Sequence, residues 1–495
     1  MSIRVRAAPS PTGAPHVGTA YIAMFNMAFA RKHHGQLVLR IEDTDQGRSS
    51  KKHEKQLTTA LRWLGIEWQE GPDIGGPSGP YRQSERLHLY AQYAKQLVDQ
   101  GQAYYSFTSA EELASWRERR NSDEPAPYEA EREQSPSDAL KKIEAGKSHV
   151  IRMKIPRDRD NAITVTDTLR GEISFDYSQI DDQVLLKSDG FPTYHLAVVV
   201  DDYLMGITHV IRGEEWIPST PKHLLLYEWF GWHPPELTHL PLLLNTDRSK
   251  MSKRRNPTSI AYYQRAGYLP EALLNYLALM AHPPAKDGEE KFDFTSLVER
   301  FDLNHINLGG SVFDIEKLNW LNSRYIREDL TPTDILNALK NWAINDEYIG
   351  GMIPLIQERM NTLGDFMPLC SFFFTREITP AIKDLVSEKS DEGVVVQILQ
   401  TAIWALEKIS PWNAEGVQIA VQQVGKYWQI PVRDVTRPLF TAIMGKPVGP
   451  PLYESIALLD LDLTRARLQS AMLLLGGLSK KKERNLEKAW HQALA

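Results

Sequence analysis

Residues 8–19 read APSPTGAPHVGT and lie between two segments with different patterns. Residues 3–8 alternate in the way a strand does, and residues 20–31 follow a helical pattern. A second apolar run, residues 37–41, comes after the helix. This order predicts a strand, a tight loop, a helix and a second strand. It therefore predicts a βαβ unit in a parallel sheet.

The loop in this unit has the composition of a phosphate-binding loop. Ser10 and Thr12 supply hydroxyl groups, Gly13 and Gly18 supply permissive backbone, and the helix that follows has N–H groups available at its first turn. The acidic residues 42–45 come directly after the second strand. Because ligands of open α/β sheets bind outside the carboxyl ends of the strands, we expect these acidic residues to face the same site.

A basic segment lies more than two hundred residues further along the chain, where residues 250–254 read KMSKR. Two lysines that flank a serine can place ammonium charges and a hydroxyl group around a polyphosphate. A Lys/Arg cluster alone is more often a solvated turn, and a His-x-Gly pattern alone is more often a surface or helix-capping histidine. The combination of both with an acidic strand end favours a nucleotide site.

The same combination resembles the class I aminoacyl-tRNA synthetases, whose two motifs are written HIGH and KMSKS. Here they read HVGT at residues 16–19 and KMSKR at residues 250–254, and Thr19 resembles the glutamyl and glutaminyl branch. The chain looks like the bacterial glutamyl-tRNA synthetases through most of its first 325 residues. The strings that carry this resemblance are RAAPSPTG (6–13), RIEDTD (40–45), GFPTYHLA (190–197), VDD (200–202) and VIRGEEW (210–216).

The resemblance implies a set of ATP-binding residues. His16 would contact the phosphates, and Lys250 and Lys253 would close over the leaving pyrophosphate, with Mg²⁺ sharing its charge. These three residues are the candidate catalytic residues. The whole candidate ATP-binding set is Ser10, Thr12, Gly13, His16, Gly18, Lys250, Ser252, Lys253 and Arg254.

A glutamate site follows from the same resemblance and agrees with the charges of the ligand. Glutamate carries two carboxylates and one ammonium group, so its site requires fixed cations and one carboxylate. Arg6 and Arg212 are the candidate cations, and Glu42 is the candidate counter-charge for the amine. Family matching adds Ser10 and Tyr194. The open alternatives are an exposed strand position for Arg6 and a core position for Tyr194.

The resemblance also implies a multidomain protein, α/β in its first part and all-α in its second. Residues 1–83 and 195–245 would form a Rossmann-type parallel-sheet catalytic domain, interrupted by an acceptor-stem-binding domain at residues 84–194. Residues 246–328 would carry the KMSKR loop and the stem-contact domain. Residues 329–495 would form a helical anticodon-binding region with a subdomain boundary near residue 385.

Apolar runs predict further elements. Four short runs predict strands, and the last of them would resume the catalytic sheet: residues 150–155, 163–165, 184–186 and 196–200. From residue 258 onward the apolar spacing of three and four predicts helices. Glutaminyl enzymes of this branch carry C-terminal β-barrels, which need many short alternating strands. The helical pattern therefore favours the glutamyl member.

Composition is that of a globular protein with several domains. The chain has 495 residues, 42% hydrophobic and 24% charged, and no run approaches the roughly 18 apolar residues of a membrane span. Its one cysteine, Cys370, suits a reducing compartment and removes Cys-based zinc sites. We expect a cytoplasmic monomer with no structural zinc, no other structural metal and no membrane contact. The net charge of −6 does not exclude RNA binding, which depends on local patches.

The leading hypothesis is therefore glutamate-tRNA ligase activity with ATP, L-glutamate and tRNA(Glu) as substrates, and with tRNA(Gln) as a further candidate. Arg359 is the residue expected to approach an anticodon base, the alternative being a solvated helix position. The alternative functions are a glutaminyl-tRNA synthetase, a small-molecule nucleotidyltransferase and an inactive tRNA-binding protein. Chain length disfavours the second, and the presence of His16, Lys250 and Lys253 disfavours the third.

Overall fold

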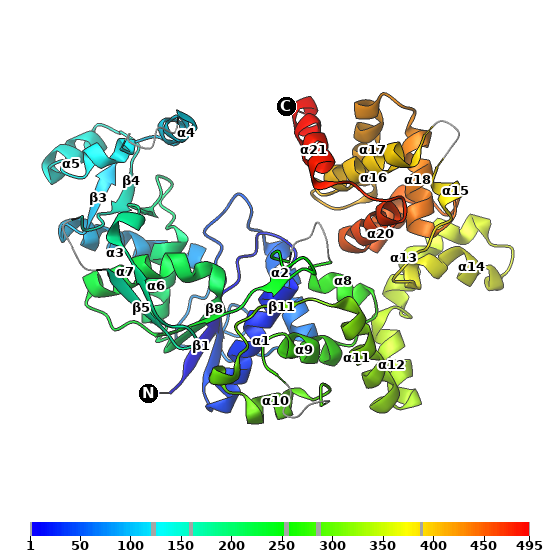
Figure 1. Cartoon of the computed structure of the whole chain (residues 1–495), viewed down its shortest axis with the longest axis horizontal. Coiled ribbons are helices and arrows are strands. Elements are labelled where there is room, and N and C mark those ends of the chain that lie inside the picture. The colour runs from blue at the N-terminus through cyan, green and yellow to red at the C-terminus, as the bar shows by residue number, and fades with distance from the viewer. Residues whose placement is uncertain are drawn as a thin grey trace. The chain divides into compact units, whose positions relative to one another are not determined.

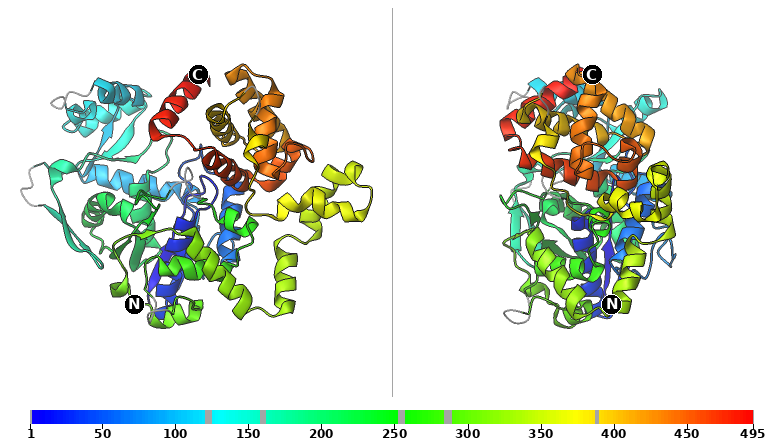
Figure 2. Two further views of the ribbon diagram at one scale, coloured as in Figure 1. Left: turned by 45° about the vertical axis from the view of Figure 1, so that its right-hand side comes forward. Right: turned by 90° about the vertical axis from the view of Figure 1, so that its right-hand side faces the viewer.

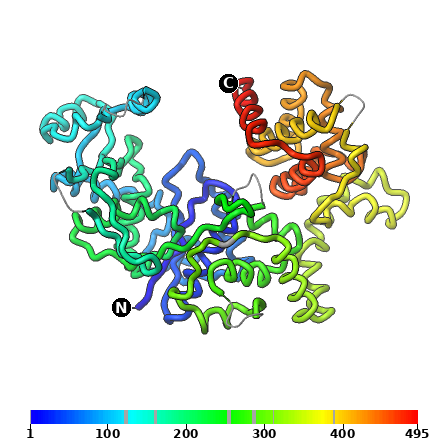
Figure 3. Tube along the Cα trace, in the orientation of Figure 1, coloured from blue at the N-terminus to red at the C-terminus, as the bar shows by residue number. Residues whose placement is uncertain are grey.

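The computed structural model describes residues 2–119, 125–157, 162–251, 257–283, 289–386 and 390–494. The chain divides into two compact units: unit 1 is Met1–Lys250 with Leu273–Asp314, and unit 2 is Met251–Ala272 with Ile315–Ala495. Figure 3 lets the reader follow the chain from its blue N-terminus to its red C-terminus. Ser252, Lys253 and Arg254 of the basic motif lie outside the described residues.

The predicted βαβ unit is confirmed. β1 (Arg4–Ala7) pairs in parallel with β2 (Gln36–Leu39), and α1 (Val17–Lys32) connects the two strands and lies beside β1 in Figure 1. α1 is buried along nearly its whole length, and its Phe25 ring contacts Phe301 with centroids 5.6 Å apart. This packing fixes residues 8–16 as a loop that runs from the carboxyl end of β1 to the first turn of α1.

A second sheet lies next to β1. β8 (His209–Gly213) and β9 (Glu236–Leu240) are parallel, and α7 (Thr220–Phe230) lies between them in the chain. β5 (Ile163–Asp167) pairs in parallel with β9, and β6 (Gly171–Phe175) pairs antiparallel with β5. The N–H of Thr208 donates to the carbonyl of Arg4 at 2.9 Å, which holds the start of β8 beside the start of β1.

Residues 196–200 belong to a helix, α6 (Tyr194–Leu204), so the predicted strand is wrong there. A run of five apolar residues fits a buried strand and a buried helix equally well. All residues from 196 to 202 are buried, since α3 (Leu87–Asp99) and α7 both pack against α6. Burial on so many sides removes the polar face that would have identified the helix from the sequence.

The other elements of unit 1 include a small antiparallel sheet. It consists of β3 (Ala103–Ser106), β4 (Val150–Met153) and β7 (Val184–Leu186) in that order. The strands predicted at 150–155 and 184–186 are confirmed as β4, which ends at Met153, and β7, and the strand predicted at 163–165 is confirmed as β5 of the larger sheet. α9 (Pro270–Leu279) runs from unit 2 into unit 1. The remaining elements are α2 (Lys51–Trp63), α4 (Ala110–Arg119), α5 (Pro136–Glu144), β10 (Leu243–Leu244), α10 (Phe294–Arg300) and β11 (Ser311–Val312).

Unit 2 is helical throughout its described residues, which confirms the prediction for the chain beyond residue 315. Its centre is α16 (Glu392–Leu406), which packs against α17 (Ala414–Trp428) and α20 (Leu461–Leu474), as the yellow to red ribbons of Figure 2 show. The other helices are α8 (Ile260–Arg265), α11 (Ile315–Glu328), α12 (Pro332–Trp342), α13 (Asp346–Ile356), α14 (Phe366–Cys370), α15 (Ile382–Leu385), α18 (Val432–Met444), α19 (Leu452–Leu459) and α21 (Lys480–Leu494). None of the helices described in either unit has the length and apolar character needed to cross a membrane.

Candidate active site

The loop before α1 has the geometry of an anion site. His16 is the N-cap residue of α1, and its ring Nδ1 accepts a hydrogen bond from the N–H of Thr19 at 3.2 Å. A Cβ atom on Gly18 would lie 2.9 Å from this nitrogen, so glycine is what leaves room for the ring. The first turn of α1 carries no acidic side chain. The positive end of the helix dipole therefore faces the loop without an internal counter-charge in that turn.

The structure brings the other predicted loop residues to the same place. Ser10 is exposed, Thr12 and Gly13 are partly exposed, and no atom lies within 4 Å of a Cβ built on Gly13. The N–H of Glu42 donates to the carbonyl of Pro9 at 3.1 Å, which fixes the loop against the acidic strand end. The predicted neighbourhood of the loop and residue 42 is therefore present.

Close to this loop, three arginines and three carboxylates form a buried group that we call the acid–arginine network. Asp202 Oδ1 accepts hydrogen bonds from Arg40 Nη1 at 2.6 Å and from Arg6 Nε at 3.2 Å. Arg40 also donates to Glu42 Oε1 at 3.1 Å. The charges of the network are balanced in number. Its members are Arg6, Arg40, Arg86, Glu42, Asp201 and Asp202.

The carboxylates of the network differ in their titration. Burial raises the pKa of Glu42, and the attraction of Arg40 and Arg6 only partly offsets this effect. Burial also acts to raise the pKa of Asp202, but Arg40 and Arg6 outweigh it and hold the pKa below its ordinary value. Asp202 is therefore held in its ionised form, whereas the ionisation of Glu42 depends more on its surroundings.

Arg212 on β8 has a different set of partners. Its Nε donates to His239 Nε2 at 3.0 Å, and its Nη1 donates to Tyr194 Oη at 3.1 Å. Its Nη2 donates to Thr220 Oγ1 at 2.9 Å, and Nη1 lies 3.4 Å from His223 Nδ1. None of these partners is a carboxylate, and within the described part of the chain Arg212 forms no ion pair. These five residues are called the Arg212 cluster below.

His223 of this cluster and its neighbour His195 are held neutral. Burial lowers the pKa of His223 far below its ordinary value, and the neighbouring Arg212 lowers it further. His223 Nε2 lies 3.1 Å from Nδ1 of His195, whose pKa burial lowers to about 4. Because arginine only donates hydrogen bonds, the His223 nitrogen facing Arg212 must be the unprotonated one. Its other nitrogen then donates to His195.

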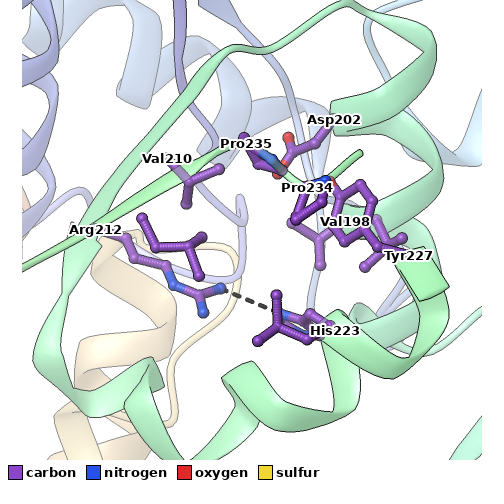
Figure 4. Close-up of a pocket in the computed structure, with 11 residues that line it drawn as sticks. Val198, Asp202, Val210, Arg212, His223, Tyr227, Pro234 and Pro235 are labelled. Atoms are coloured by element: carbon purple, nitrogen blue, oxygen red, sulfur yellow. Dashed lines mark hydrogen bonds between the residues drawn. The ribbon is translucent and has the colours of Figure 1, made fainter. Parts of the chain in front are cut away.

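A small cavity joins the two groups of charges (Figure 4). Its volume is about 20 Å³, and its wall includes Asp202 of the acid–arginine network and Arg212 and His223 of the Arg212 cluster. The figure shows the guanidinium of Arg212 pointing toward His223, with their hydrogen bond dashed. Tyr227 from α7 also lines the cavity, and its buried hydroxyl has no hydrogen-bond partner among the described residues. A space of this size can hold about one water molecule.

The basic motif is only partly described. Lys250 is exposed, and its Nζ lies 3.2 Å from Glu215 Oε1, a pair with little influence on stability at such exposure. A Cβ on Gly213 would lie 2.0 Å from the Glu215 carboxylate, so Gly213 allows this carboxylate to fold back over the end of β8. The predictions for Ser252, Lys253 and Arg254 fall outside the described residues.

Sequence reasoning named one part of the site and missed another. The predicted residues Arg6, Glu42, Tyr194 and Arg212 all belong to the two buried groups of unit 1. The missed residues are Arg86, Thr220, His223, His239 and Asp167, none of which stands in a recognisable string. One signal was available: residues 201 and 202 are consecutive acids within an apolar run, and buried acids require cationic partners.

Arg359 lies in unit 2, in a short 3₁₀ turn (Gln357–Arg359) that follows α13. It is exposed, which both anticodon contact and the alternative of a solvated helix position predict. The described residues contain no group of three His, Cys, Asp or Glu side chains that could hold a metal ion.

Comparisons with known proteins identify the family of the chain. The family described as tRNA synthetases class I (E and Q), catalytic domain, matches residues 2–320, and the family described as anticodon binding domain matches residues 334–472. The chain is 48% identical to a glutamate–tRNA ligase of Marinobacter nauticus and 49% identical to one of Marinomonas sp., with 99% of each chain covered.

Solved structures give the same result. The chain is similar to the crystal structure of a glutamate tRNA ligase from Elizabethkingia meningosepticum in complex with its amino acid. The TM-score is 0.64 at 33% sequence identity, covering 96% of this chain and 100% of that one. With the family matches over both units and the full-length identity to curated relatives, this chain belongs to the glutamate–tRNA ligases, in the glutamyl and glutaminyl branch of the class I tRNA synthetases.

Proposed function

We propose that this chain activates L-glutamate with ATP and transfers it to the 3′-terminal adenosine of tRNA(Glu), and that Arg212 reads the side-chain carboxylate. The observation that carries the proposal is the set of partners of Arg212. It is a buried cation whose described partners are all neutral, beside a cavity. A carboxylate ligand would supply the missing counter-charge through charge-assisted hydrogen bonds.

In the first step, a carboxylate oxygen of glutamate attacks the α-phosphorus of ATP, and the bond to pyrophosphate breaks. The nucleophile is already ionised, so the step requires in-line positioning and charge stabilisation more than proton transfer. The first turn of α1 and the loop around His16 and Gly18 suit the triphosphate, because helix N-termini favour anions. Mg²⁺ carried by the nucleotide would share the phosphate charge. Lys250 and Lys253 are the candidate cations for the leaving pyrophosphate.

The acid–arginine network suits the other end of the amino acid. Arg6 and Arg40 are already paired with Asp202, so they supply little free positive charge. Glu42 is the carboxylate with the raised pKa, and an ammonium group beside it would favour its ionised form. We infer that Glu42 faces the substrate amine and that Arg6 positions the acids around it. In the second step, the terminal hydroxyl of the tRNA attacks the carbonyl of the mixed anhydride and AMP leaves.

The glutaminyl activity is the second candidate, because both enzymes share the branch. The charge of Arg212 argues against it, since a neutral amide leaves a buried guanidinium without a counter-ion. Transfer to tRNA(Gln), anticodon reading by Arg359, and a cytoplasmic monomer remain parts of the proposal. The described helices of unit 2 suit the anticodon-binding family that matches them.

ATP–pyrophosphate exchange tests the proposal. Exchange should require glutamate, and glutamine or no amino acid should support none. Exchange should also depend on added tRNA(Glu), as the family resemblance implies. Exchange with glutamine and not with glutamate would replace the proposal by the glutaminyl activity. Exchange with neither amino acid would reject both.

A further inference from the structure

The orientation of Arg212 depends on a chain of buried groups from three neighbouring strands. Arg212 on β8 and His239 on β9 are register partners, and Arg212 Nε donates to His239 Nε2 at 3.0 Å. His239 Nδ1 in turn lies 2.7 Å from Oδ2 of Asp167 at the end of β5. His239 and Asp167 are both buried.

The direction of each hydrogen bond from Arg212 through His239 to Asp167 is determined. Arginine has no acceptor, so His239 Nε2 must carry a lone pair and Nδ1 must carry the proton. That proton is donated to Asp167. Burial lowers the pKa of His239, which keeps the ring neutral. A doubly protonated ring would present an N–H group to the N–H group of Arg212.

The carboxylate of Asp167 is held in place by hydrogen bonds to both of its oxygens. Its Oδ1 accepts the backbone N–H groups of Leu169 at 2.9 Å and Arg170 at 3.0 Å. Its Oδ2 accepts both the backbone N–H of His239 at 3.0 Å and the ring N–H. With four hydrogen bonds the carboxylate is saturated, so it holds the imidazole in one tautomer and one orientation.

We propose that Asp167 and His239 are positioning residues for substrate specificity: they hold the guanidinium of Arg212 toward the side-chain carboxylate of the amino acid without forming an ion pair with it. This inference rests on the proposed function. The arrangement places the counter-charge of Arg212 one imidazole ring away. A direct carboxylate partner would neutralise the guanidinium, whereas a neutral ring orients it and leaves its positive charge unmatched for the substrate carboxylate.

Two amide substitutions of His239 separate this role from a structural one. Glutamine reaches as far as Nε2 of histidine, so His239→Gln keeps an acceptor for Arg212 but loses the close contact to Asp167. Asparagine reaches only as far as Nδ1, so His239→Asn keeps a donor for Asp167 but loses the acceptor for Arg212. A role through Arg212 predicts that Gln is the better replacement. A role in anchoring Asp167 and the strand ends predicts that Asn is.

The measurement is aminoacylation of tRNA(Glu) by the full chain, after the parent protein has been shown to charge it with glutamate. His239→Asn should raise the KM for glutamate at least tenfold, the scale of a lost hydrogen bond to a charged group, while the KM for ATP changes by less than about twofold. His239→Gln should stay within about threefold of the parent, a loss of well under 1.4 kcal/mol. Equal losses for both variants, or a better result for Asn, would overturn the inference.

Asp167→Asn provides a second test of the inference if His239→Asn does not fold. The new amide can donate to His239 Nδ1, which moves the ring proton to Nε2 and turns it against Arg212. The KM for glutamate should rise as in His239→Asn, with the KM for ATP unchanged. A normal KM for glutamate in a folded Asp167→Asn protein contradicts the inference. A parent protein that does not charge tRNA with glutamate contradicts the proposed function instead.

Discussion

Arg40 and Arg212 are both buried guanidiniums of unit 1, and they differ in what surrounds them. Arg40 contacts Asp202 and Glu42 directly, within a network of three arginines and three carboxyl groups. Arg212 contacts Tyr194, Thr220 and two histidines, and the carboxylate of Asp167 lies beyond His239. An arginine whose charge is already matched stabilises the fold. An arginine oriented by neutral groups keeps its charge for a ligand.

Neutral partners alone do not identify a ligand site. Arg467 in α20 is also buried and donates to the carbonyls of Ile443 at 2.8 Å and Phe372 at 2.6 Å. Burial lowers its pKa to about 10. Its partners are backbone carbonyls from two other segments, so it joins elements of unit 2. Arg212 differs because most of its partners are side chains and because it lines a cavity.

The largest expected effect concerns the acid–arginine network. Arg40→Met should lower the free energy of unfolding by about 3–5 kcal/mol, because it leaves buried carboxylates without their central cation. The midpoint of urea unfolding, followed by tryptophan fluorescence, measures this. The matched control is Arg48→Met, which removes an exposed ion pair with Asp45 and should cost less than about 1 kcal/mol. Similar costs for the two variants would mean that the network contributes no more than a surface pair.

The next effect concerns the Arg212 cluster and should appear in kinetics. Arg212→Ala should lower kcat/KM for glutamate by a factor equivalent to about 2–5 kcal/mol of transition-state stabilisation, the scale for losing a buried charge-assisted pair. The KM for ATP should change little, because Arg212 faces the amino acid. Arg62→Met, which removes an exposed cation of α2, is the control and should match the parent. Unchanged glutamate kinetics in Arg212→Ala would remove Arg212 from amino-acid recognition.

The sequence predicted the βαβ unit because its loop and its helix have strong local signals. It could not separate the roles of Arg6 and Arg212, since each arginine stands in an equally recognisable string. The difference lies in tertiary contacts: Asp202, which pairs with Arg6, is 196 residues away in the chain. His223 and His239 gave no signal, because an isolated histidine has no distinctive spacing. α6 was missed for a related reason, since burial on several sides removed its amphipathic pattern.

His195, the neutral neighbour of His223, should make the free energy of unfolding depend on pH. Burial lowers the pKa of His195 from 6.5 to about 4, so between these values the unfolded chain binds a proton that the folded chain does not. The protein therefore has its full free energy of unfolding above pH 6.5 and loses up to about 3 kcal/mol of it as the pH falls toward 4. Urea unfolding at pH 7 and pH 5 should show a smaller loss in His195→Gln than in the parent. Identical losses in both proteins would mean that His195 is protonated in the fold.

Arg359 extends the comparison to an arginine for which the described residues supply neither an acidic nor a neutral partner. It is exposed on its 3₁₀ turn, and no hydrogen bond or ion pair to it is present in the described part of unit 2. A planar guanidinium with all its donors available can bind a base edge through two hydrogen bonds or stack on it, so we expect it to contribute to anticodon reading.

Arg359→Gln should weaken discrimination between tRNA(Glu) and tRNA(Gln) by roughly 1–3 kcal/mol, the scale for one bidentate base contact. Arg359 is not one of the candidate residues for glutamate activation, so activation should be unchanged. The kcat/KM for charging each transcript, measured with the parent and with Arg359→Gln, gives the discrimination directly. Lys383→Gln is a control in the same unit that removes a cation without a predicted base contact. If the ratio of the two transcripts is the same in all three proteins, Arg359 is an ordinary solvated arginine.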